Sequence, residues 1–205
     1  MTEVKPKILL EYDESSCFRE PINEIKGELS KYFEVRTEVS ISFNNGGTSF
    51  YLALLLLSSP FMYFSKGFFT KIGENLGNEV STDLRKGYRI MRKQLAKIIT
   101  RSAKGNTPIV IIRIPIKENQ HHSMNQGING IIKTNDEKLF CECFDRVEEL
   151  YHIAQKIIEE IGRKGDIIGI TFNYNFQTDS WEPEWCTKVG PTQFLYRNGK
   201  WEIGE

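Results

Sequence analysis

The segment Phe33–Phe43, FEVRTEVSISF, decides the fold class of this chain. Apolar side chains alternate along it with charged or hydroxyl side chains, and Thr37 falls on the apolar side. Strict alternation of this kind predicts a β-strand with one face in the core and the other in water. A second segment, Asp166–Phe176, alternates in the same way. We therefore expect a sheet that is covered on one face only at these strands.

Amphipathic stretches between the strands predict the helices that cover the buried face. They are residues 21–31, Ser81–Lys104 and Glu137–Gly162. Ser81 is a suitable cap for the second helix, and the third carries a complete apolar stripe. Further strand-like runs are Lys7–Asp13, Pro108–Ile116, Asn129–Thr134 and the two sides of Asn198–Gly199. The Asn-Gly pair predicts a type I′ hairpin.

Together these patterns predict an α+β fold, a two-layer domain with helices mainly on one face of a mixed or antiparallel sheet. The expected order is roughly β-α-β-α-α-β-β-α-β-β. A chain of 205 residues without repeats or linkers indicates one domain, residues 1–205, with two parts at 1–105 and 106–205. Four irregularly spaced cysteines and the lack of a signal peptide favour a reducing, cytoplasmic location.

Ser49–Phe69 is the most apolar part of the sequence. A membrane-spanning helix needs about 20 predominantly apolar residues, and Pro60 would break a helix here. We expect two short helices buried against the sheet, over Phe50–Leu57 and Phe61–Phe64. The alternative is an exposed apolar surface for a partner or a membrane. Its candidate residues are Phe50, Tyr51, Leu54, Phe61, Phe64 and Phe68.

The helix predicted over Ser81–Lys104 is strongly basic on its polar face. Such a face can bind an acidic protein, an anionic lipid surface or nucleic acid. Nucleic acid is the least supported, because no aromatic side chains interleave with the bases. The acidic helix over Glu137–Gly162 is a candidate for neutralising this face within the protein. The candidate anion-binding residues are Arg85, Arg89, Arg92, Lys93 and Lys97.

A Gly-rich turn follows the first alternating strand, at residues 44–49. Glycines between a strand and a helix can cradle a phosphate. No lysine follows Gly47, so a plain turn with a helix cap is the better interpretation. The candidate phosphate-binding residues are Asn45, Gly46, Gly47 and Thr48.

The sequence contains no recognisable catalytic motif, and we expect neither a metal site nor a cofactor. Cys141 and Cys143 do not have the paired spacing of a zinc site. The C-terminal third is rich in aromatic residues, including Trp181, Trp185 and Trp201. We expect residues 178–192 to form a loop whose tryptophans cap the sheet, although loop tryptophans can also anchor a partner.

These observations favour a non-enzymatic intracellular interaction module that binds another protein or a second copy of itself. One alternative is a peripheral membrane-associating or membrane-disrupting protein that uses residues 50–69 and the basic helix 81–104. The other is a nucleotide- or phosphate-binding enzyme that uses the turn at 44–49.

Overall fold

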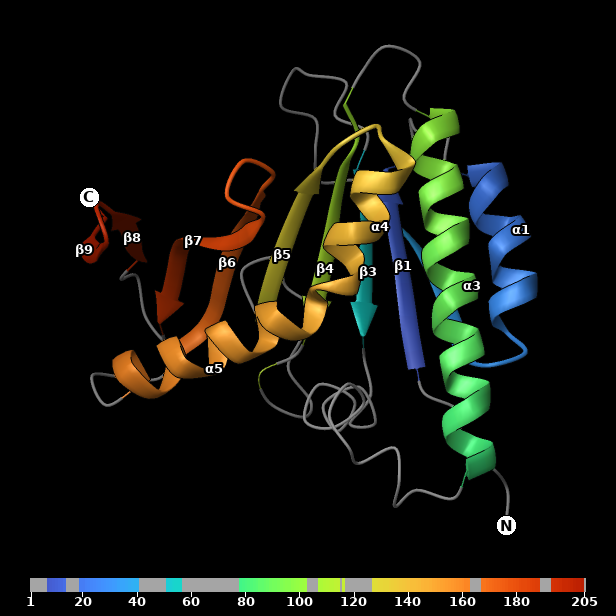
Figure 1. Cartoon of the computed structure of the whole chain (residues 1–205), viewed down its shortest axis with the longest axis horizontal. Coiled ribbons are helices and arrows are strands. Elements are labelled where there is room, and N and C mark those ends of the chain that lie inside the picture. The colour runs from blue at the N-terminus through green and yellow to red at the C-terminus, as the bar shows by residue number, and fades with distance from the viewer. Residues whose placement is uncertain are drawn as a thin grey trace.

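The computed structural model describes residues 7–13, 19–40, 51–56, 78–102, 107–114, 116, 127–162, 167–188 and 193–204. These residues form four helices and nine strands, in the sheet order β2-β1-β3-β4-β5-β6-β7-β8-β9. The sheet is mixed, and Figure 1 shows the helices lying along one side of it. The predicted α+β fold with a mixed sheet is confirmed.

From β2 to β7, parallel neighbours alternate with antiparallel ones across the sheet. The strands are β1 (Lys7–Asp13), β2 (Glu34–Ser40), β3 (Tyr51–Leu56), β4 (Ile109–Ile114), β5 (Gly127–Lys133), β6 (Ile167–Asn175), β7 (Ser180–Lys188), β8 (Gln193–Arg197) and β9 (Lys200–Ile203). The helices are α1 (Arg19–Leu29), α3 (Asn78–Ser102), α4 (Glu137–Asp145) and α5 (Val147–Gly162). The pairs β1/β2, β3/β4 and β5/β6 are parallel, and each has at least one helix between its strands in the chain. β6 to β9 form an antiparallel meander.

One hydrophobic core lies between the sheet and the helices. Along β1, Ile8, Leu10 and Tyr12 are buried in it. Every described helix contributes to the same core, through residues such as Ile25, Leu95, Phe140 and Leu150. Leu9 points to the opposite face of β1, as alternation requires, and it is also buried. Both faces of the sheet are therefore covered at this strand.

The apolar run does not form the helix that we expected over Phe50–Leu57. Residues Tyr51–Leu56 are strand β3, which lies between β1 and β4 in the middle of the sheet. Leu54 is in register with Leu10 on one side and Ile112 on the other, and both of these are fully buried. A short apolar run suits a strand covered on both faces as well as it suits a buried helix, so periodicity did not distinguish them. The helix expected over Phe61–Phe64 lies outside the described residues.

Two helix predictions need correction at their boundaries. α3 begins at Asn78, so Ser81 lies inside the helix and does not cap it. The acidic helix is interrupted at Arg146, which separates α4 from α5. Arg146 has φ −97° and ψ 15°, and its carbonyl accepts a hydrogen bond from Trp181 Nε1 of the sheet. The same carbonyl also accepts the helical bond from Leu150 N at 3.2 Å, so the bond from the sheet adds to the helical one at this junction.

Two strand predictions were also incomplete. Residues 178–192 were expected to be a loop, but Ser180–Lys188 form β7. Only Trp185–Thr187 of this strand pair with β8, so Pro183 occupies a stretch with an open edge, where a missing N–H is tolerated. The outer face of β2 is exposed as predicted, through Glu34, Arg36 and Glu38. The corresponding face of β6 is not exposed, because Thr171 is buried there.

The start of α4 gives a first testable prediction. Asp136 is its N-cap, with an extended backbone, and Asp136 Oδ1 accepts a hydrogen bond from Leu139 N at 2.9 Å. Asp136→Ala should lower the free energy of unfolding by about 0.5–2 kcal/mol, because it leaves that N–H without its cap. Urea denaturation measures the change. Asp136→Ser keeps a capping oxygen and should retain most of the stability, so equal losses in the two variants would contradict a capping role.

Candidate functional site

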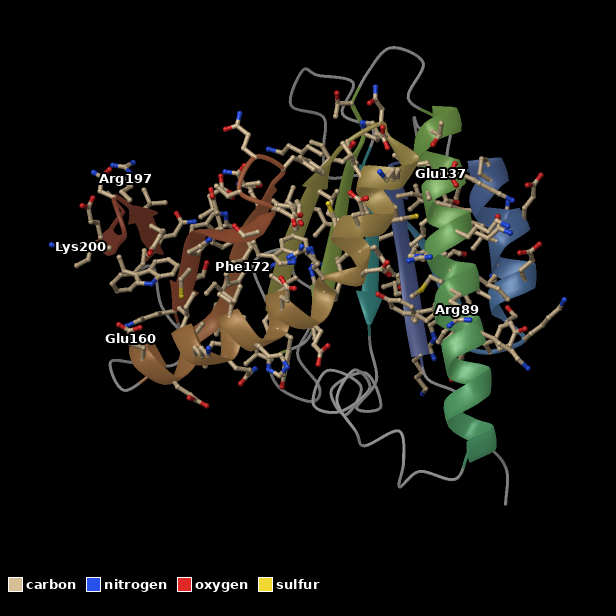
Figure 2. All side chains as sticks on the ribbon, viewed as in Figure 1. Arg89, Glu137, Glu160, Phe172, Arg197 and Lys200 are labelled. Atoms are coloured by element: carbon tan, nitrogen blue, oxygen red, sulfur yellow. The ribbon has the colours of Figure 1, made fainter. Side chains whose placement is uncertain are left out.

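The basic face of α3 is partly neutralised within the protein. Arg92 forms an ion pair with Asp145 of α4, as the charges of the two helices predicted. Arg89 and Lys93 are exposed and Lys97 is half-buried, and none of the three has an ion pair with another described residue. Figure 2 places Arg89 on α3, at the opposite end of the molecule from Lys200. Binding of an anionic partner by this face stays a prediction.

Several predicted site residues lie where the structure does not describe them. The phosphate-binding candidates Asn45, Gly46, Gly47 and Thr48 are all outside the described residues. The same holds for the interface candidates Phe50, Phe61, Phe64 and Phe68, and for the side chain of Arg85. Tyr51 and Leu54 belong to β3, whose backbone pairs with a strand on each side. An exposed apolar surface formed by these candidates therefore stays a prediction.

The described thiols are unsuited to nucleophilic chemistry. Burial raises the pKa of Cys186 to about 11 and that of Cys143 to about 12. The pKa of Cys141 is also raised, chiefly by burial. Because the thiolate is the nucleophilic form, these side chains are protonated and weakly reactive at neutral pH. Within the described residues, no three His, Cys, Asp or Glu side chains gather as metal ligands.

The aromatic C-terminal third divides into a core part and a surface part. In the core part, Trp181 is buried and packs edge-to-face against Tyr174, with ring centroids 5.0 Å apart. Burial raises the pKa of Tyr174, and its hydroxyl donates a hydrogen bond to Asp179, which raises the pKa further. Through the hydrogen bond from Trp181 Nε1 to Arg146 O, this part of the sheet is attached to the α4–α5 junction. Trp181 is therefore a core residue of strand β7 and not, as expected, a loop residue that caps the sheet.

The surface part is the β8–β9 hairpin, which turns at Asn198–Gly199 with positive φ at both residues, as predicted. Its strands pair so that four apolar side chains share one face. These are Phe194, Tyr196, Trp201 and Ile203, which we call the hairpin face. Phe194 is also in register with Cys186, a residue of the helix-side core. The hairpin face therefore continues the face of the sheet that the helices cover.

The principal packing contacts of the described helices do not reach this continuation. α5 packs against β5 and β6, whereas β8 packs against β7 and β9. In Figure 1 the hairpin lies at the far end of the sheet, beside the C-terminus. Ile203 is 71% exposed, while Phe194 and Trp201 are half-buried against the edge of the core. Tyr196 and Trp201 stack edge-to-face, with ring centroids 5.1 Å apart.

Comparison with known proteins identifies no relative of this chain. No protein-family model, no curated protein and no solved structure matches the chain. None of the described helices combines the length and the apolar character needed to cross a bilayer.

Proposed function

We propose that this protein is a binding module that acts through contact with another protein or with a second copy of itself, and that the hairpin face is its contact surface. The observation that supports the proposal is that the apolar, core-facing side of the sheet continues onto the hairpin, beyond the principal contacts of the described helices. Its most exposed member is Ile203, at 71%. An apolar patch of this kind on a protein surface usually marks an interaction site.

Two further properties of the hairpin support the proposal. Tyr196 and Trp201 belong to the residue types that are enriched at protein interfaces. β9 is also the last of the described strands in the sheet order, so no described strand pairs with its outer backbone edge, where a strand from a partner could add. A partner could thus pair with the backbone and cover the apolar side chains at the same time.

A substitution of Ile203 tests the proposal. Because the side chain is mostly exposed, Ile203→Glu should change the free energy of unfolding by no more than about 0.5 kcal/mol. It should nevertheless abolish association, measured by light scattering of the purified protein and by capture of partners from native lysate. Glu202→Ala, on the opposite face of the same strand, should associate like the wild type. The proposal fails if the wild type is a monomer that captures nothing, or if Ile203→Glu associates normally.

A further inference from the structure

A buried polar row crosses the sheet on the face opposite the described helices. Arg113 of β4 is in register with Asn129 of β5, which is in register with Thr171 of β6. Their neighbours Ile112 and Ile170 are buried in the helix-side core, so alternation turns the polar side chains to the other face. The exposed fractions of Arg113, Asn129 and Thr171 are 4%, 3% and 2%.

The hydrogen bonding of this row is incomplete. Arg113 Nε donates to Asn129 Oδ1 at 2.7 Å, and Asn129 Nδ2 donates to Gly127 O at 3.4 Å. Arg113 Nη1 and Thr171 Oγ1 are buried without a hydrogen-bond partner. Across the described part of the chain, no carboxylate forms an ion pair with Arg113. A positive charge on β4 and a hydroxyl on β6, with Asn129 of β5 between them, are therefore buried on one face of the sheet with unused bonding capacity.

This arrangement is unfavourable unless an anion completes it. A guanidinium stays protonated in proteins, so it cannot relieve its burial by losing a proton. A buried charge without an opposite charge is strongly destabilising. The planar guanidinium fork matches the oxygens of a carboxylate or phosphate, and Asn129 holds the Nε side of that fork in place.

We infer that Arg113, Asn129 and Thr171 form a binding site for an oxyanion, either a small carboxylate or a phosphate group. Arg113 supplies the charge and two N–H donors through its terminal nitrogens. Thr171 supplies a hydroxyl donor from β6, which is two strands away from β4. Asn129, on β5 between them, orients the guanidinium. This site is distinct from the hairpin face, and each can be tested without the other.

Calorimetric titration of the full chain with sodium phosphate and, separately, with sodium acetate tests the inference, with sodium chloride at equal ionic strength as reference. We expect saturable binding of at least one of the two oxyanions. Phosphate alone or acetate alone would each support the site and identify which oxyanion it takes. Saturable binding of neither would overturn it.

Substitutions then assign the binding to this row. Arg113→Met should abolish it, and Arg113→Lys, which keeps the charge but lacks the fork, should weaken it about tenfold or more. Thr171→Val should weaken it by about tenfold through loss of one donor. Arg36→Met is the matched control, because Arg36 is an exposed arginine of β2. It should bind like the wild type.

The substitutions also separate a real site from its alternatives. Equal stabilisation of the wild type and Arg113→Met by phosphate would indicate a general salt effect and overturn the inference. A chain that binds no oxyanion but is strongly destabilised by Arg113→Met would also overturn it, because the guanidinium would then have a partner within the protein. If Arg113→Met does not fold, Arg113→Lys and Thr171→Val take its place in the test. Unchanged oxyanion affinity in both variants would overturn the inference.

Discussion

Replacing Trp181 by alanine is expected to lower the free energy of unfolding by about 3–5 kcal/mol, the usual range for deleting a large aromatic side chain from a core. Trp181 is buried, and its ring packs against Tyr174 at a centroid separation of 5.0 Å. Its Nε1 donates to Arg146 O at 2.8 Å, at the junction of α4 and α5. The alanine variant would lose the packing and the bond from the indole, while the carbonyl would keep its helical bond from Leu150 N.

Urea unfolding followed by far-ultraviolet circular dichroism measures this loss without relying on tryptophan fluorescence. Trp185→Ala is the matched control, because Trp185 is only half-buried and lies in the same strand. Its expected loss is about 1 kcal/mol. If Trp181→Ala does not fold, Trp181→Phe retains a ring and should lose about 0.5–1.5 kcal/mol through the lost hydrogen bond. Equal losses at Trp181 and Trp185 would show that the bond to the helix junction is not decisive.

The alternation that predicted the fold class holds only in part, because Val39 on the apolar side of β2 is 43% exposed. In β2 the charged side chains are exposed, and the helix-facing residues of β1 are buried as the pattern requires. Local chemistry also fixed the hairpin at Asn198–Gly199, because only a few residue types adopt positive φ at both turn positions. Signals that depend on neighbouring residues were therefore readable from the sequence.

Features that depend on distant parts of the chain were not readable in the same way. The central position of β3 follows from pairing with β1 and β4, and neither partner is adjacent to it in sequence. An apolar run of this length is compatible with either a strand or a helix, so the pairing decides. Likewise, Pro183 made the segment that forms β7 look like a loop. A proline is tolerated there because β8 does not extend along that part of the strand, and the sequence pattern does not show this.

The buried polar row is the part of the molecule that sequence patterns concealed most. Thr171 lies on the face of β6 that alternation predicts to be exposed to solvent, but its side chain is buried. Arg113 is the one charged residue in the run PIVIIRIPI, which we interpreted as a central strand. A lone arginine inside an apolar central strand was the available signal. Its meaning appeared only when the register placed it beside Asn129 and Thr171.

A second large packing effect should come from Gly130 of β5, where α5 and Trp181 both approach the strand. A Cβ atom at this position would lie 2.5 Å from Leu150 Cδ2 and 2.9 Å from Trp181 Cζ3. Neither side chain has room to move aside, because both are buried in the core. Gly130→Val is therefore expected to lower the free energy of unfolding by about 3 kcal/mol through overpacking.

Gly27→Ala in α1 provides the matched control for a glycine substitution. No atom lies within 4 Å of a Cβ built at Gly27, so alanine there should stabilise the protein by about 0.5–1 kcal/mol through its higher helix propensity. A double-mutant cycle then identifies the clash directly. Leu150→Val removes the closest methyl group, so Gly130→Ala should be less destabilising in that background by about 0.5 kcal/mol or more. Additive effects would mean that α5 moves away from the sheet instead, and that the close approach at Gly130 is not required for the fold.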